Sequence, residues 1–185
     1  MTKPVAGRHF ALITALTLAA ASPAFPVAAA APPTTAALIA SATSAAPASI
    51  GAKAAVMTGD GKLLRKGSNG WTCLPDSPAT PGPDAMCFDK GGLHWAMAWM
   101  AHKLPTPSTI GFAYMLAGGV DASNTDPFAT KPTGKWVRTG PHVMILNAAV
   151  AEGSPYPSRE AKPDTSKPYV MFGGTPYAHI MMPTK

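Results

Sequence analysis

The stretch DKGGLHWAMAWMAHKLPTP, residues 89–107, decides the fold class because it contains the clearest helical pattern in the chain. Asp89 is a suitable N-cap whose carboxylate is favoured by the helix dipole, and Pro105 and Pro107 cannot continue a helix. Apolar residues recur at i, i+3, i+4 and i+7 from Leu93 onward. We therefore expect a largely buried helix over residues 90–103. Its expected core residues are Trp95, Met97, Trp99 and Met100.

Trp95 and Trp99 lie four residues apart, so their rings share one face of this helix. Such a pair can form a platform for a sugar or another flat ligand. It is more often part of a hydrophobic core. Both interpretations stay open at the level of the sequence.

Short runs typical of strands lie on both sides of the helix. Residues 53–57 and 62–65 flank an Asp60-Gly61 turn and predict a hairpin, because glycine tolerates the positive φ of such turns. The further predicted strands are residues 70–73, 109–117, 135–147 and 169–182, the last interrupted by Gly173-Gly174 and read as a hairpin. The predicted fold class is α+β, with a small antiparallel sheet packed on one main buried helix and a disulfide-closed loop. Residues 154–168 are rich in proline and charge and predict an exposed loop.

The N-terminal residues have the pattern of an export signal. Lys3 and Arg8 precede an apolar run of about a dozen residues, too short for a bilayer span of roughly twenty. We expect residues 1–30 to be a cleaved signal peptide, which leaves no transmembrane anchor and predicts a secreted or periplasmic protein. Residues 31–49 consist almost entirely of Ala, Pro, Thr and Ser, and we expect a disordered leader. Residues 50–185 then form a single globular domain.

Cys73 and Cys87 are the only cysteines. In an oxidising compartment a disulfide is the expected state, and the spacing matches no zinc motif. A catalytic thiol or a metal site is the less favoured alternative.

The charge pattern argues against a nucleic-acid-binding protein. Only 13% of residues are charged, and the basic residues are scattered rather than gathered into a stripe. We therefore expect no nucleic-acid partner.

Two predicted strands repeat the pattern His-x-Met, at His142-Val143-Met144 and His179-Ile180-Met181. Residues two apart on a strand face the same side. If the strands pair in one sheet, His142, Met144, His179 and Met181 could converge on one face, and imidazole with thioether suits copper. Methionine also fills gaps in a buried sheet, and a buried histidine often bonds only a backbone carbonyl. Copper is thus one interpretation beside a structural role and a metal-free pocket.

The loop ASNTDPF, with Asp121 before it, gathers oxygen-bearing side chains. Asp121, Asn124 and Asp126 form a candidate polar site, but their spacing departs from the EF-hand pattern. Asx side chains also stabilise turns by bonding their own backbone, which is the favoured interpretation.

The chain contains no G-x-S-x-G elbow, phosphate-binding loop or dinucleotide fingerprint, so no catalytic residue is identified. Several motifs resemble those of a family of small exported bacterial proteins without assigned function. They are NGWTC (69–73) with Pro75-Asp76 and Cys87, ASNTDPF (122–128), GPH-x-M (140–144) and GTPYAH-x-M (174–181). The resemblance implies one domain over about residues 50–183 and implies no activity.

The sequence thus favours an exported protein that binds a small ligand or a metal ion without catalysis. Two alternatives remain: a hydrolase-like enzyme with a His/Asp site, and a structural or interaction protein of the cell envelope. A pocket that joins His142 or His179 to an aspartate would favour the enzyme.

Overall fold

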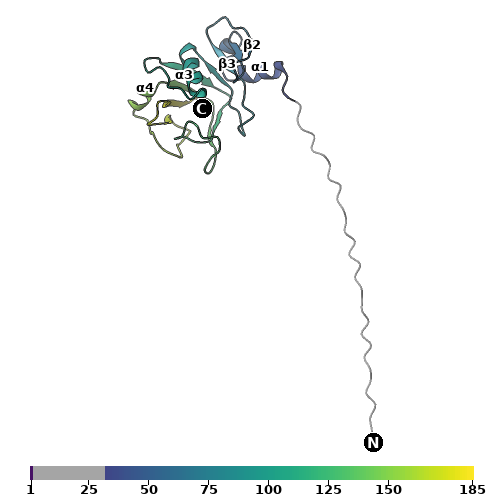
Figure 1. The fold of residues 1–185 in the computed structure, drawn as a ribbon, viewed down its shortest axis with the longest axis vertical. Helices are drawn as coiled ribbons and strands as arrows, with labels where there is room; N and C mark the ends of the chain where they lie inside the picture. The colour runs from purple at the N-terminus through teal and green to yellow at the C-terminus, as the bar shows by residue number, and fades with distance from the viewer. Residues whose placement is uncertain (2–31) are drawn as a thin grey trace. The chain divides into compact units, whose positions relative to one another are not determined.

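One large sheet is the framework of residues 33–185 in the computed structural model, which describes Met1 and residues 32–185 (Figure 1). Its eight strands lie in the order β2-β1-β3-β4-β5-β8-β10-β9. Neighbouring strands are antiparallel except β1 and β3, which are parallel. In chain order these strands are β1 (Ala55–Met57), β2 (Leu63–Arg65), β3 (Thr72–Leu74), β4 (Met86–Phe88), β5 (Gly111–Met115), β8 (His142–Leu146), β9 (Tyr169–Met171) and β10 (His179–Pro183).

A second ladder and four helices complete the described part of the chain. The ladder joins β6 (Gly119–Asp121) to β7 (Val137–Thr139). The helices are α1 (Thr35–Ser44), α2 (Ala48–Gly51), α3 (Lys90–Met100) and α4 (Ala148–Glu152). None of these helices is long and apolar enough to cross a membrane.

The expected mixture of strands and helices is present, but the expected small sheet is wrong. The sheet has eight strands because β4, absent from the sequence prediction, joins β3 to β5. The predicted strand 135–147 is divided at Gly140-Pro141 into β7 and β8, which belong to different sheets. Proline has no N–H to donate to a ladder, so a break at this point is expected. Both predicted hairpins are confirmed: β1 pairs with β2, and β9 with β10.

Helix α3 begins as predicted and ends three residues early. The Asp89 carboxylate accepts the N–H of Gly92 at 2.7 Å, which confirms the N-cap. The helix ends at Met100, and His102 has a positive φ of 54°.

The predicted core residues of α3 divide between two environments. Trp95 is buried and Trp99 is half-buried against the core, as expected. Met97 and Met100 are 41% and 36% exposed, so their assignment to the core is wrong. The helix is apolar around most of its girth, but the sheet covers only one side of it.

The backbone of the first turn of α3 packs directly against the backbone at the start of β5. A Cβ on Gly111 would lie 2.2 Å from the Gly92 nitrogen, and one on Gly91 would lie 2.5 Å from the Ile110 carbonyl oxygen. The same Asp89 carboxylate oxygen that caps α3 also accepts the Phe112 N–H at 3.0 Å. The glycines that weaken the helix as a local structure are therefore required by its packing.

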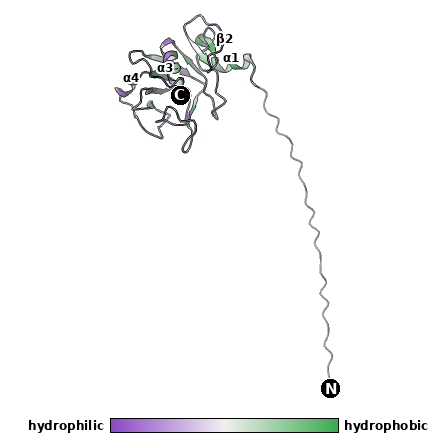
Figure 2. Cartoon of the chain, in the orientation of Figure 1, coloured by the Kyte–Doolittle hydropathy of each residue, from purple (hydrophilic) through white to green (hydrophobic). Residues whose placement is uncertain are grey.

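Residues 32–49 are not part of a disordered leader, which the composition predicts for residues 31–49. The Thr34 hydroxyl accepts the Ala37 N–H at the start of α1, and alanine has the highest helix propensity. Ala42 and Ala45 are completely buried in a cluster with Val56, Cys73 and Cys87. The small side chains allow α1 to lie close to the sheet, and α1 is coloured mainly as hydrophobic in Figure 2. The domain therefore begins at about Pro33 rather than at residue 50. The predicted signal peptide lies outside the described residues, apart from Met1.

Cys73 and Cys87 are joined by a disulfide, as predicted. They are direct partners in the ladder between β3 and β4, and both are completely buried. The bond closes the loop that carries the prolines of residues 75–83.

We predict that Gly111→Ala strongly destabilises the domain. Its methyl group would meet the backbone of α3, which cannot move aside as a flexible side chain can, so the loss should reach about 3 kcal/mol or more. Gly134→Ala is the matched control, since a Cβ there meets nothing within 4 Å. Urea denaturation of both variants measures the difference. Equal stability would contradict the close packing of α3 on β5.

We also predict that reduction of the disulfide lowers the free energy of unfolding by about 3 kcal/mol, the value expected for a loop of this length. The Cys73→Ser, Cys87→Ser double variant should lose a similar amount. Thiol labelling of the oxidised, denatured protein should find no reactive cysteine. Two labelled thiols would show that the bond does not form.

Candidate functional site

One face of the large sheet is unusually rich in methionine. Ladder partners on β5, β8, β10 and β9 place Met115, Met144, Met181 and Met171 on this face. Met57 and Met86 pack against the same hydrophobic cluster from the other half of the sheet. Thioether side chains are flexible and polarizable, so this face can adapt to the shape of a bound molecule.

His142 and His179 lie on this same face, as the sequence predicts. Strands β8 and β10 are antiparallel neighbours, with Met144 opposite Met181. The histidines themselves are not opposite each other: His142 faces Pro183, and His179 faces Leu146. Four residues of strand separate the two positions, about 13 Å along the ladder. The methionine pair therefore lies between the two histidines.

His142 is completely buried and has one free nitrogen. Its Nδ1 lies 2.8 Å from the Gly140 carbonyl oxygen. A carbonyl can only accept, so Nδ1 carries the proton and Nε2 is a bare lone pair. Nε2 has no hydrogen-bond partner among the described residues. Burial lowers the pKa of His142, which keeps the ring neutral and this lone pair available.

His179 has the same tautomer in an aromatic environment. Its Nδ1 donates to the Tyr177 carbonyl oxygen at 2.9 Å. The ring packs edge-on against Trp95 and Phe172, with centroid distances of 5.1 and 5.4 Å. Burial lowers the pKa of His179 to about 4, and the nearby His142 acts in the same direction. Both histidines are therefore neutral at pH 7.

A cavity of about 960 Å³ opens over this face. Met144 and Met181 contribute to its floor, Trp95 and Trp99 of α3 to one wall, and Ala37 and Leu38 of α1 to its rim. Both buried histidines line it. Trp95 and Trp99 thus belong both to the core and to the wall of a binding space, so the two interpretations of this pair are compatible.

The wall of the cavity includes a strained residue. Phe172 has a positive φ of 58°, which is unfavourable for a bulky side chain. Its N–H donates to the Asn124 carbonyl oxygen at 2.8 Å, and its ring packs against Trp99 and His179. Loop 122–128 therefore holds a conformation that places an aromatic ring beside the buried imidazole.

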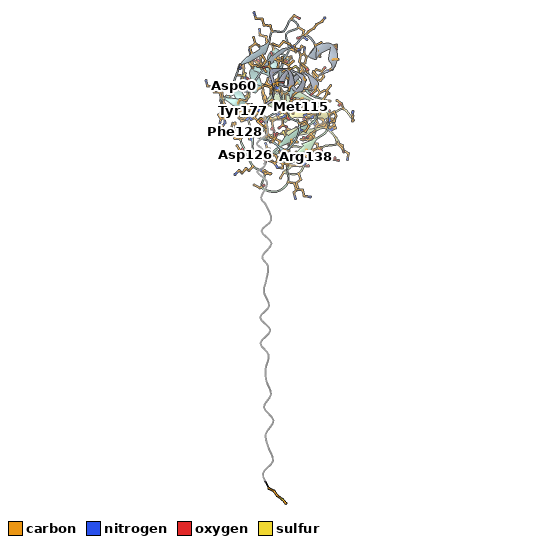
Figure 3. All side chains as sticks on the ribbon, turned by 90° about the vertical axis from the view of Figure 1, so that its right-hand side faces the viewer. Asp60, Met115, Asp126, Phe128, Arg138 and Tyr177 are labelled. Atoms are coloured by element: carbon orange, nitrogen blue, oxygen red, sulfur yellow. A yellow bond between two sulfur atoms is a disulfide. The ribbon has the colours of Figure 1, made fainter. Side chains whose placement is uncertain are left out.

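The three residues of the candidate polar site have separate roles. Asp121 lines the cavity and accepts the Ser123 N–H. The Asn124 side chain is buried and donates to the carbonyl oxygens of Glu160 and Val170. Asp126 accepts the Phe128 N–H, and Phe128 packs against Tyr177, labelled near it in Figure 3. Asn124 and Asp126 thus support the loop, and only Asp121 faces the cavity.

Asp121 is the most perturbed carboxyl group at the cavity. Burial raises its pKa to about 6, and the neighbouring Asp84 adds to the rise. Close by, the hydroxyls of Thr139 and Tyr169 share a buried hydrogen bond of 2.7 Å. Burial raises the pKa of Tyr169 to about 12, so this phenol is neutral. Asp76, Asp84 and Asp121 all line the cavity, so it combines a largely apolar lining with carboxyl groups.

The described residues contain no group of three His, Cys, Asp or Glu side chains arranged to hold a metal ion. Thioether ligands fall outside that description, and they are what this face offers. Met115 is the cavity residue that sequence reasoning missed. The strand that contains Met115 is predicted from the sequence, but the sequence does not show which strand pairs with it. The pairing of β5 with β8 places Met115 opposite His142.

The opposed pKa shifts predict compensating effects of pH on stability. Below about pH 6.5 the unfolded chain protonates His179 while the folded chain does not, so acid costs on the order of 3 kcal/mol by pH 4. Asp121 acts in the opposite sense, since between about pH 6 and 4 only the folded chain keeps its proton there.

Asp121→Asn removes the compensation, so this variant should lose about 2 kcal/mol more than the unmodified protein between pH 7 and pH 4.5. His179→Gln should show the reverse change. Urea denaturation at several pH values measures both slopes. Identical pH profiles in all three proteins would contradict the assignment.

The chain matches no protein-family model, no curated protein and no solved structure.

Proposed function

We propose that this protein binds a small apolar molecule in the cavity over the methionine-rich face, without catalysing a reaction on it. The observation that carries the proposal is the cavity itself, whose volume of about 960 Å³ lies in the range of small-molecule sites. Its floor and wall combine thioethers with the rings of Trp95, Trp99 and Phe172. Such a lining binds by contact area, while the two neutral imidazoles supply polar contacts.

We further propose that binding takes place outside the cytoplasm. The basic and apolar pattern of residues 1–30 supports export, and the Cys73–Cys87 disulfide is consistent with an oxidising compartment. The resemblance to small exported bacterial proteins favours the same location.

A hydrolase-like enzyme is the second candidate, because Asp121 and His142 line the same cavity. A pKa of about 6 would suit Asp121 to acid–base chemistry. However, the Nδ1 atoms of His142 and His179 both bond backbone carbonyls rather than a carboxylate. The described residues thus offer no imidazole oriented by an acid, and binding remains the favoured function. A purely structural protein would have no need of a cavity lined in this way.

We predict that Met181→Ala weakens the binding of an apolar probe, N-phenyl-1-naphthylamine, about tenfold. The change removes part of the cavity floor, and a contact of this size contributes about 1.4 kcal/mol. Met182→Ala is the matched control, because the next side chain of β10 packs in a different cluster on the opposite face. Isothermal titration calorimetry of the unmodified protein should give one saturable site.

Thermal melts should accompany the titrations, so that only folded variants are compared. No saturable binding by the unmodified protein would refute the proposed function. Equal affinity in the two variants would place the probe outside this cavity and would also count against it.

A further inference from the structure

We propose that His142, Met115 and Met144 form a binding site for Cu(I) at one end of the cavity. These three residues also line the cavity of the proposed function, but Cu(I) binding uses their lone pairs and does not require an apolar ligand to be bound. Met115, labelled in Figure 3, is the residue that changes the earlier interpretation of the His-x-Met pattern. The ligands come from two neighbouring strands rather than from the two repeats of that pattern.

His142 supplies a nitrogen prepared for a metal. The ring is completely buried, Nδ1–H donates to the Gly140 carbonyl oxygen, and Nε2 has no partner among the described residues. A buried acceptor without a hydrogen-bond partner lowers the stability of the fold, so a ligand bound to Nε2 of His142 would offset this cost. Metal-binding histidines typically donate their other ring N–H to a carbonyl or carboxylate, which is the arrangement of His142.

Met115 brings a sulfur to the same place. It lies directly opposite His142 in the ladder between β5 and β8, where paired Cβ atoms are about 5 Å apart. A Cβ on Gly119 would lie 3.6 Å from Met115 Sδ and 3.1 Å from His142 Cε1, the carbon next to Nε2. The sulfur and the imidazole edge therefore both lie next to Gly119, where a side chain would occupy the space beside them.

Met144 supplies the third ligand. It is two residues from His142 on β8, so it faces the same side about 7 Å away, within reach of a flexible thioether. Its partner on β5 is Ala113, whose side chain is small. Its partner on β10 is Met181, which gives the site a further sulfur nearby.

This set of donors selects the metal. The two thioethers are soft ligands that favour Cu(I), and imidazole also binds copper. Zinc binds thiolate, imidazole and carboxylate rather than thioether, and calcium and magnesium prefer oxygen donors. No described group of three His, Cys, Asp or Glu is available to such ions. Asp84 and Asp121 line the same cavity but are not part of this ligand set, and burying one positive charge costs less than burying two.

His179 is not a ligand of this site. It lies four residues of strand away from the position opposite His142, and its ring is enclosed by Trp95 and Phe172. A single ion held by both imidazoles, as the repeated pattern suggests, would have to span that distance. The proposed site therefore keeps His142 and Met144 and replaces the second His-x-Met with Met115.

The test is a competition titration of the full-length protein with Cu(I) and bicinchoninate in the presence of ascorbate. The unmodified protein should remove one Cu(I) per chain from the chelator. Met115→Leu and Met144→Leu preserve side-chain volume and should fold normally. Each should weaken Cu(I) binding at least tenfold. Met182→Leu on the opposite face and Met97→Leu on the exposed side of α3 are controls that should change nothing.

X-ray absorption at the copper edge provides a second readout that does not depend on affinity. The unmodified protein should show sulfur and imidazole nitrogen around copper, and the Met115→Leu, Met144→Leu double variant should lose the sulfur. His94→Gln removes an exposed imidazole of α3 and should leave the spectrum unchanged.

Absence of competition with the chelator, or unchanged affinity in both leucine variants, would overturn the proposal. The two proposals fail independently. The probe titration needs no copper and the copper titration needs no probe, so either result can be negative while the other is positive.

Discussion

The close approach of α3 to β5 is the constraint on which the rest of the structure depends. Gly91, Gly92 and Gly111 have no side chains, so the two backbones meet where ordinary packing would hold them several ångströms further apart. Asp89 fixes the junction because one of its carboxylate oxygens accepts hydrogen bonds from two N–H groups, that of Gly92 in the first turn of the helix and that of Phe112. A helix fixed at one end of β5 covers only part of the sheet. The remainder of that face is free to form the floor of a cavity.

The same packing explains the unusual lining of the cavity. A sheet face that is covered by a close-packed helix is normally filled by branched residues with few rotamers. Over the cavity the chain has methionine instead, which tolerates both an empty and a filled space. The two buried histidines are neutral because burial disfavours their charged form, and each satisfies only one nitrogen with a neighbouring carbonyl. The face is thus lined mainly by apolar side chains, and its thioether sulfurs and unpaired imidazole nitrogens offer lone pairs.

The sequence predicts the local features of this domain well, because they depend on neighbouring residues. The Asp89 cap, both hairpins and the disulfide follow from turn chemistry, capping and redox context. The leader was misjudged because low complexity can indicate disorder, whereas here alanines serve as a small-residue face for packing on the sheet. Met97 and Met100 were misjudged because periodicity shows which residues are apolar and not how much of the helix the sheet covers.

The site depends on pairing between distant strands, which periodicity does not determine. The common face of His142 and His179 could be predicted, since residues two apart on a strand share a side. The register between β8 and β10 could not be predicted. This register separates the two histidines and places a methionine pair between them.

The partner of His142 on its other side comes from β5, more than twenty residues earlier in the chain. Glycine at position 119 then has a clear physical reason, because a Cβ there would lie 3.0 Å from the Met115 methyl carbon and 3.1 Å from His142 Cε1. The repeated His-x-Met motif therefore identifies the sheet face that carries the candidate site. The pairing of β8 with β5 and β10 determines which side chains on that face are neighbours.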